Sequence, residues 1–208
     1  MAAIILVRHA EPEQLPPGVG GHWTDTALSD LGRRQAAAVA ARLKDEIAGL
    51  PCRLASSSLK RAAQTADAIA EALGIDPAGI DRAADLREYN DGKAQGGTLE
   101  ALRGTAPDGA AESWQTFYDR VAACMERLTA GEDRLLVVVS HYGAMINIVT
   151  WWLGVGLAYG DARVSFDAQL ACITVLRENR QGRHTIERLN DLAHLMPEGL
   201  CRPIQLEP

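Results

Sequence analysis

The sequence predicts an α/β protein of three layers, with a mostly parallel central sheet covered by helices on both faces. Short apolar runs of strand length alternate along the chain with segments of helical periodicity, as in folds built from β-α units. The two strongest runs, residues 3–7 and 135–139, each end in a polar segment that contains histidine. The length of 208 residues suffices for the substantial core of one large domain. We therefore expect a single domain over residues 1–208.

The first quarter of the chain predicts a strand, a loop and a helix. Residues 3–7 form an apolar strand, and residues 12–23 are so rich in Pro and Gly that they must form a loop, either a lid over a site or a plain surface loop. Ser29 or Asp30 can cap a helix over residues 31–48, because Ala36, Val39, Leu43 and Ile47 recur on one face.

Residues 52–111 contain two further strands and a helix. An apolar strand is predicted over 52–56, and the serines that follow it mark the start of an Ala-rich helix that ends at Gly74. A strand over 81–86 comes just before Glu88. Residues 89–111 are polar and glycine-rich, which favours a lid-like excursion with a short helical piece around 99–102.

The second half of the chain repeats the strand-then-helix pattern. Apolar periodicity from Trp114 to Leu128 predicts an amphipathic helix, and residues 135–139 form the strongest strand of the sequence. The segment 144–153 is apolar nearly all round, which at this length indicates a buried helix and not a membrane span. Residues 171–177 and 183–189 form a closing pair of strands, for which an antiparallel arrangement at a sheet edge is one option.

Composition narrows the possible partners and compartment. A net charge of -6 and a pI near 5.4 argue against a nucleic-acid or acidic-membrane surface, yet allow a local pocket of arginines for an anionic ligand. The first apolar run is too short for a signal sequence or a membrane span. The four cysteines are far apart, which indicates reduced thiols and neither a zinc site nor a disulfide framework. We expect a cytoplasmic protein.

Several reactive side chains follow the predicted strands. In parallel α/β sheets ligands bind beyond the carboxyl ends of the strands, and there the sequence places Arg8, His9, Glu88 and His141. Arg8 offers a planar fork of donors for phosphate or carboxylate oxygens, and His9 is a nucleophile or base that titrates near neutral pH. Alone, this pair could equally be a strand end with a solvated arginine and a half-buried histidine.

Arg61 and Glu88 complete the candidate site. Arg61 falls in the first turn of its helix, where free N–H groups and the helix dipole favour an anion and mildly disfavour a cation, so a ligand role is preferred over a solvated arginine. Glu88 alone reads as a loop carboxylate paired with Arg87 or Lys93. With the others it forms a set of a nucleophile, two phosphate clamps, a carboxyl acid and a second imidazole, which requires no metal and no cofactor.

A set of short motifs, in order along nearly the whole chain, resembles the histidine phosphatase or phosphoglycerate mutase-like superfamily. The motifs are Arg8-His9-Ala10-Glu11, Leu28-Ser29-x-x-Gly32-x-x-Gln35-Ala36, Ser57-x-Leu59-x-Arg61-Ala62-x-Gln64-Thr65-Ala66, Leu86-x-Glu88-x-x-x-Gly92, Ser140-His141-x-Gly143 and Asn190-Asp191-x-x-His194-Leu195. The resemblance implies a phosphoglycerate mutase-like fold and a phosphohistidine intermediate on His9.

The residues fit that chemistry. For in-line attack the ring nitrogen of His9 must be unprotonated, and the charges of Arg8 and Arg61 lower its pKa toward that state. The same arginines can bind the non-bridging phosphate oxygens and stabilise the transition state. His141 could add another donor to the phosphate. Glu88 could protonate the leaving oxygen and later deprotonate the hydrolytic water.

Departures from the family pattern favour a phosphatase over a mutase. The usual Arg-His-Gly reads Arg-His-Ala here, a change that is tolerated unless the glycine needs a positive φ. Where the mutase and sugar-bisphosphatase branches have an asparagine the chain has Leu15, with Gln14 as a stand-in. Tyr142 replaces the aspartate of the acid phosphatase branch, which indicates the mutase-like branch with Glu88 as the acid. The excursion after Glu88 is shorter than a mutase lid.

The leading hypothesis is therefore a metal-independent phosphatase for phosphomonoesters. A mutase and a phospho-ligand binding module are the alternatives, and a metal hydrolase using His9, His22 and His141 is disfavoured because it lacks closely spaced carboxylates. We expect a small phosphorylated substrate in preference to a phosphoprotein, and no nucleic acid or membrane partner. The loops at 12–26 and 89–111 and the tail after Leu195 would set selectivity, with Gln14, His22 and Trp23 as possible contacts.

Overall fold

A six-stranded mixed sheet forms the centre of the computed structural model, which describes residues 3–15, 22–92, 111–155 and 165–201. Across the sheet the order is β3-β2-β4-β1-β5-β6. The strands are β1 (Ala3–Arg8), β2 (Cys52–Ser57), β3 (Asp81–Ala83), β4 (Leu135–Ser140), β5 (Ile173–Glu178) and β6 (His184–Asp191). The pairs β1–β4, β4–β2 and β2–β3 are parallel, and β5 lies antiparallel to both β1 and β6. The predicted α/β class with a mostly parallel sheet is confirmed.

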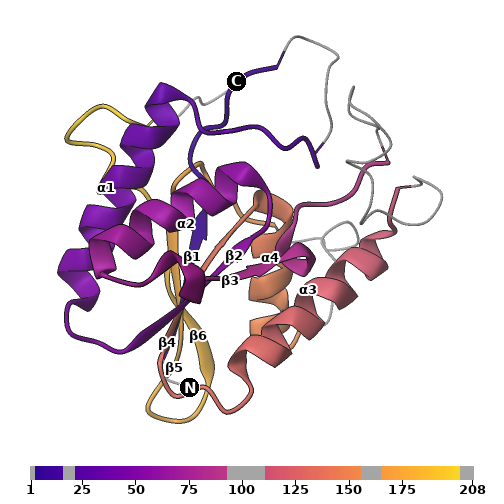
Figure 1. The fold of residues 1–208 in the computed structure, drawn as a ribbon. Coiled ribbons are helices and arrows are strands. Elements are labelled where there is room, and N and C mark those ends of the chain that lie inside the picture. Colours follow the sequence, from indigo (N-terminus) through magenta and orange to yellow (C-terminus); the bar gives the residue numbers. More distant parts are fainter. Residues whose placement is uncertain (1–2, 16–21, 93–110, 156–164, 202–208) are drawn as a thin grey trace, which may run out of the picture.

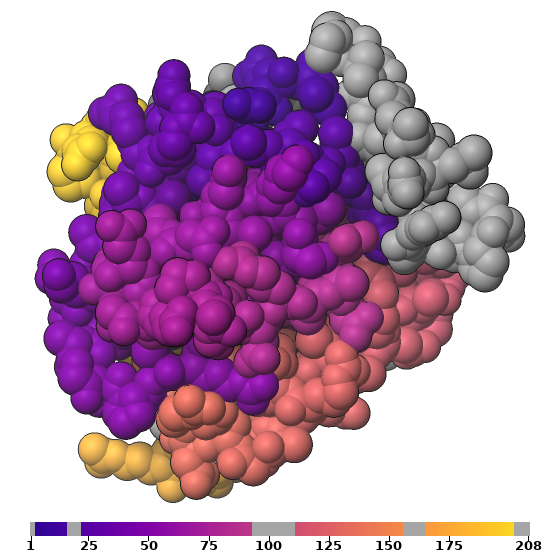
Figure 2. Space-filling view, viewed as in Figure 1, coloured from indigo at the N-terminus to yellow at the C-terminus, as the bar shows by residue number. Residues whose placement is uncertain are grey.

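Helices cover both faces of the sheet, as a three-layer fold requires (Figure 1). Among the described residues they are α1 (Asp30–Ile47), α2 (Lys60–Leu73), α3 (Trp114–Thr129) and α4 (Tyr142–Trp152), with short 3-10 turns η1 (Pro77–Gly79) and η2 (Ala84–Leu86). The helices α1 and α2 share one apolar cluster with the sheet, and α3 and α4 share another. In the space-filling view the N-terminal half of the chain, indigo to magenta, forms most of the near face (Figure 2).

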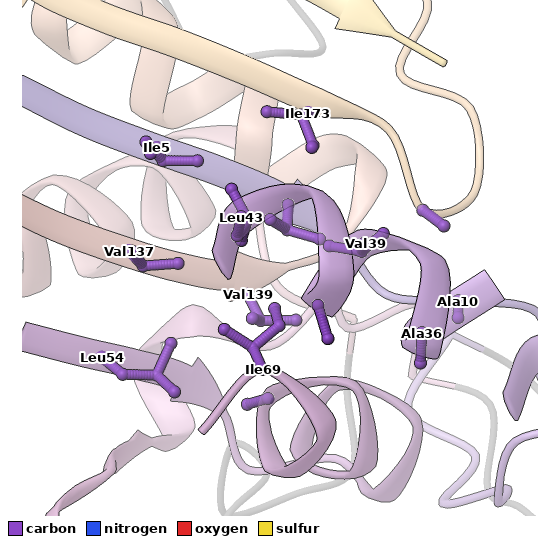
Figure 3. Packing of buried hydrophobic residues seen from close by; sticks show 14 of the residues in the cluster. Ile5, Ala10, Ala36, Val39, Leu43, Leu54, Ile69, Val137, Val139 and Ile173 are labelled. Carbon is purple, nitrogen blue, oxygen red and sulfur yellow. The ribbon is translucent and has the colours of Figure 1, made fainter. Parts of the chain in front are cut away.

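The core follows from the alternation of side chains along the two central strands. Ile5 of β1 points toward α1 and α2 and packs in one cluster with Leu43 and Ile69 (Figure 3), and Val7 belongs to the same cluster. Their neighbours Ile4 and Leu6 belong to the other cluster, with residues of α3 and α4. Successive strand residues face opposite sides, so a continuous apolar run marks a strand that is buried on both faces. The sheet is therefore held between two packed layers of helices.

The apolar segment after β4 is a buried helix, as predicted. Eight of the eleven residues of α4 are buried: Gly143, Ala144, Met145, Ile146, Asn147, Ile148, Val149 and Trp152. Its burial explains why it lacks a polar face. Within the described ranges, no helix combines the length and apolarity needed to cross a membrane.

One local prediction is wrong in detail. The strand expected over 81–86 ends at Ala83, because the chain turns into η2 and so carries Leu86 into the core, where it is fully buried. The helix predicted after the serines begins at Lys60, as expected, with Leu59 as its N-cap and no side-chain cap. The closing strands are antiparallel and lie at one side of the sheet, where β6 is the edge strand and β5 pairs with both β6 and β1. The helical piece expected around 99–102 falls outside the described residues.

Candidate active site

The ends of β1 and β4 bring the two histidines together. These strands are parallel and Arg8 is in register with Ser140, so His9 and His141 leave the sheet side by side. The His9 amide donates to the Ser140 carbonyl at 2.9 Å, and the two imidazole centroids are 5.0 Å apart. Arg61 comes from the first turn of α2, as the sequence predicts. Residues separated by more than 130 positions thus meet at the carboxyl edge of the sheet.

The hydrogen bonds of His9 define its tautomer. Arg61 Nε lies 3.3 Å from His9 Nε2, and a guanidinium can only donate, so Nε2 must carry a lone pair. The proton then lies on Nδ1, which donates to the Ala10 carbonyl at 2.8 Å. His9 is therefore held as a neutral imidazole, with its unprotonated Nε2 facing the Arg61 guanidinium.

The same reasoning assigns the proton of His141. Its Nδ1 accepts from Arg61 Nη2 at 3.2 Å, so its proton lies on Nε2 and is donated to Ser57 Oγ at 2.7 Å. Ser57 is the last residue of β2 and is fully buried. His141 is thus oriented by an arginine on one side and a hydroxyl on the other.

Arg61 links both histidines to the loop that leads into α1. In addition to the two imidazoles, its guanidinium donates to the carbonyls of His22 and Thr24 at 2.8 and 2.7 Å. Arg61 is 6% exposed, and burial is the main cause that lowers its pKa to about 10. The arginine stays charged at neutral pH, because that value is far above it.

Arg8 approaches the site from the end of β1. Its Nη1 donates to the Ala168 carbonyl at 2.6 Å, and its guanidinium carbon lies 5.5 Å from the centroid of the Tyr142 ring. The buried Nε has no hydrogen-bond partner among the described residues. Burial lowers the pKa of Arg8, while the charge of Glu88 raises it.

Electrostatics keeps both histidines neutral. The pKa of His9 lies well below its usual value, first because of burial and then because of the charges of Arg61 and Arg8. The pKa of His141 is likewise well below its usual value, with burial as the largest cause and Arg61 as the next. An unprotonated His9 is the form that can attack an electrophile, so the lowered pKa suits a nucleophile.

Glu88 joins the site after η2 and is fixed by backbone donors. The Gly143 amide donates to its Oε2 at 3.0 Å, and the Tyr89 amide donates to its Oε1 at 2.9 Å. Its charge raises the pKa of both Arg8 and Arg61, which places the carboxylate within electrostatic range of the two arginines. The five predicted site residues, Arg8, His9, Arg61, Glu88 and His141, therefore lie together at one edge of the sheet.

The alanine that replaces the usual glycine after His9 fits its position. Among the described non-glycine residues a positive φ occurs at Ala171 and Asn190, and not at Ala10. Ala10 is fully buried, and its amide donates to Thr65 Oγ1 at 3.1 Å. The concern that this position needs glycine is removed.

The loop residues that the sequence singled out have different placements. Gln14 is exposed, and the exposed His22 directs its ring toward Tyr89, with centroids 6.3 Å apart. Trp23 Nε1 donates to the Glu88 carbonyl at 2.6 Å, so this tryptophan touches the backbone of the candidate acid. Within the described ranges, no group of three or more His, Cys, Asp or Glu side chains is placed to hold a metal ion.

Two residues that contact the site were not recognised as such from the sequence. Ser57 was noted only as part of a motif, although its place at the end of β2, the neighbour of β4, could have indicated contact with His141. Arg120 lies outside every motif of the sequence. Its signal is a charge in α3 one residue before the buried Val121 and three after the buried Phe117, so it borders the apolar face.

Comparison with known proteins shows which family this chain matches. Residues 4–192 match the model of the histidine phosphatase superfamily (branch 1). The chain is 30% identical to phosphoglycerate mutase-like protein 4 of Arabidopsis thaliana over 97% of its length and 90% of the relative. It is also 30% identical to phosphoserine phosphatase 1 of Hydrogenobacter thermophilus, over 94% of its length and 95% of the relative. A mycobacterial glucosyl-3-phosphoglycerate phosphatase in complex with inorganic phosphate has a similar structure, with a TM-score of 0.70, 25% identity, and coverage of 93% of this chain and 99% of that one.

Proposed function

The chain belongs to the histidine phosphatase superfamily, and from this premise we propose that it hydrolyses phosphomonoesters through a phosphohistidine intermediate on His9. The observation that carries the proposal is the tautomer of His9. Its Nε2 is unprotonated and accepts from Arg61 Nε, and its Nδ1 proton is donated to the Ala10 carbonyl. A neutral nitrogen next to a phosphate-binding cation is the arrangement that in-line attack on phosphorus requires.

The first step transfers the phosphoryl group to the enzyme. His9 Nε2 forms a bond to phosphorus while the bond from phosphorus to the ester oxygen breaks, and Glu88 gives a proton to that leaving oxygen. Arg8 and Arg61 bind the non-bridging oxygens and stabilise the charge that they carry in the transition state. In the tautomer described above Ser57 Oγ holds the only ring proton of His141, so a hydrogen bond from His141 to the phosphate requires the other tautomer, with the proton on Nδ1.

The second step releases inorganic phosphate. The Glu88 carboxylate takes a proton from a water molecule, whose oxygen attacks phosphorus as the bond to His9 Nε2 breaks. Both steps use only side chains of this chain, so the proposal includes independence from metal ions. Phosphatase activity is expected to survive EDTA, and loss that a divalent cation restores would contradict the mechanism.

The substrate class is a small phosphorylated metabolite. Two similar proteins are named for phosphatase activity, on phosphoserine and on glucosyl-3-phosphoglycerate. A mutase is the second candidate, because another similar protein is named phosphoglycerate mutase-like. Leu15 at the position of the mutase asparagine favours the phosphatase. A panel of phosphorylated metabolites separates the two: a phosphatase accumulates inorganic phosphate, and a mutase accumulates an isomer of its substrate.

We also propose one catalytic domain over the whole chain, in the cytoplasm. The domain assignment is supported by the family match, which extends over residues 4–192. The compartment is supported by the cysteines, since Cys52, Cys124, Cys172 and Cys201 are all free thiols.

Trapping the phosphoenzyme tests the mechanism. With nitrophenyl phosphate the leaving group needs no proton, so Glu88→Gln is expected to be phosphorylated normally yet to lack the base that activates water. Phosphoenzyme that is stable to alkali and labile to acid should therefore accumulate in Glu88→Gln and be absent from His9→Ala. The measurement is a rapid alkaline quench followed by phosphopeptide mapping. A label on His141, or on any Ser or Cys, would refute the nucleophile assignment.

A further inference from the structure

We propose that Arg120 is a positioning residue for the acid–base function of Glu88. This inference rests on the proposed function, in which Glu88 is the proton donor to the leaving oxygen. It concerns a residue of α3 that lies outside the motifs found in the sequence.

Arg120 holds the backbone of the segment that carries Glu88. Its Nη1 donates to the carbonyls of Asp85 and Arg87 at 2.8 and 2.9 Å, and its Nη2 donates to the carbonyl of Glu88 itself at 2.8 Å. One guanidinium thus binds three carbonyls within four residues. Each of these bonds is charge-assisted, and the planar donor fork fixes their relative positions.

A carboxylate anchors the guanidinium in turn. Glu112 accepts from Arg120 Nε at its Oε2 and from Nη2 at its Oε1, at 2.9 and 2.6 Å. The Arg120 and Glu112 side chains are 17% and 8% exposed, so the pair is largely shielded from solvent. Glu112 also accepts from the amide of Asn90, two residues beyond Glu88. The Arg120–Glu112 ion pair therefore binds the main chain both before and after Glu88, through the Arg87 carbonyl and the Asn90 amide.

The aromatic surroundings restrict the guanidinium further. Its central carbon lies 4.6 Å from the centroid of the Phe117 ring and 5.9 Å from that of Trp23. Trp23 donates to the same Glu88 carbonyl that Arg120 binds. The Glu88 main chain is thus fixed by Arg120 and Trp23, while its carboxylate is fixed by the amides of Tyr89 and Gly143.

A fixed position of Glu88 matters most for the step in which it protonates the leaving oxygen. A general acid must lie within hydrogen-bond reach of the leaving oxygen, and a displacement of 1 Å can cost about 10²-fold in rate. Esters with a poor leaving group need the proton, whereas a nitrophenolate leaves without it. Loss of Arg120 should therefore slow alkyl phosphates selectively.

The test compares Arg120→Met with Arg127→Met. Arg127 also lies on α3 and donates to Asp85 Oδ2 at 2.6 Å, but its side chain is 59% exposed, and its hydrogen bonds among the described residues do not include Glu88. For each variant kcat/KM is measured on an alkyl phosphate and on nitrophenyl phosphate. Arg120→Met is expected to lose about 10²-fold on the alkyl phosphate and only a few-fold on nitrophenyl phosphate. Arg127→Met should be unchanged on both.

Glu88→Gln serves as the benchmark for the acid itself. If Glu88→Gln shows no selective loss on the alkyl phosphate, the assignment of Glu88 in the proposed function fails. Suppose that Glu88→Gln does show the selective loss. The positioning role of Arg120 is then refuted if Arg120→Met lowers kcat/KM equally for the alkyl phosphate and for nitrophenyl phosphate, or lowers it for neither. Arg120→Lys, which keeps the charge but cannot reach all of the acceptors, should lie between the wild type and Arg120→Met. It decides the question in the same way if Arg120→Met does not fold.

Discussion

Gly143 shows how closely a single residue limits the geometry of the site. A Cβ atom at this position would lie 2.5 Å from Glu88 Oε1 and 3.0 Å from Phe117 Cε1. Contacts shorter than 3.0 Å force one of the two partners to move. The Gly143 amide is also a donor to Glu88, so the residue that leaves room for the carboxylate is the one that binds it.

We therefore expect Gly143→Ala to displace the Glu88 carboxylate. Turnover of an alkyl phosphate should fall by about 10²-fold, because a displaced acid no longer reaches the leaving oxygen. The matched control is Gly79→Ala, since nothing lies within 4 Å of a Cβ built at Gly79. Steady-state kinetics on both variants is the measurement. Wild-type turnover in Gly143→Ala would mean that the Glu88 position is not critical.

At the scale of elements, α1 shows where stability comes from. Its buried residues, among them Val39 and Leu43, pack on the sheet through the cluster in Figure 3. Ser29 caps the helix by accepting from the Gly32 amide at 2.9 Å, which satisfies one of the free donors of the first turn. The cap fixes where α1 begins, but the packing of its apolar face supplies most of the stabilisation of the helix.

Leu43→Ala is expected to destabilise the protein by about 3 kcal/mol, because the side chain is fully buried and its loss leaves a cavity. Leu50→Ala, in the connection that follows α1, should change stability by less than about 0.5 kcal/mol, because Leu50 is 56% exposed. Urea unfolding of the two variants measures the difference. Equal effects would contradict the assignment of the α1 face to the core.

Sequence patterns predicted the elements better than the contacts between them. The strands β1 and β4 can be predicted from their apolar runs, because a strand that is buried on both faces has apolar residues at every position. The end of β3 could not be predicted, since the turn at Ala84 depends on the core that receives Leu86. Arg120 could not be assigned for a different reason. Its acceptors are mostly backbone carbonyls, which every residue has, so no residue type in the sequence marks them.

At the scale of the whole molecule, the buried histidines couple stability to pH. Burial is the largest cause that lowers the pKa values of the buried His9 and His141 and of the half-buried His194. Their folded pKa values lie below the unfolded value of about 6.5, so as pH falls through that value the unfolded chain binds protons that the folded chain does not. The free energy of unfolding should therefore decrease below about pH 6.5, and should not depend on these groups above it.

Each such histidine can contribute up to about 1.4 kcal/mol per pH unit in that range. Urea unfolding between pH 7.5 and pH 5.5 measures the slope in the wild type and in His9→Ala. The variant should have a shallower slope, because one of the groups that resist protonation in the folded state is gone. An unchanged slope would show that His9 titrates alike in the folded and unfolded chain.

The position of β1 at the centre of the sheet has a consequence for biosynthesis. Arg8 and His9 precede several of their hydrogen-bond partners by more than 130 positions, namely Ser140, Ala168, Ala171 and Cys172. Contacts between residues so distant in sequence close late, because the chain entropy of long loops must be lost first. On a ribosome, His9 therefore cannot form all of its hydrogen bonds until most of the polypeptide has emerged. A nascent chain that stops before β5 carries the proposed nucleophile without the strands and loops that hold it in place.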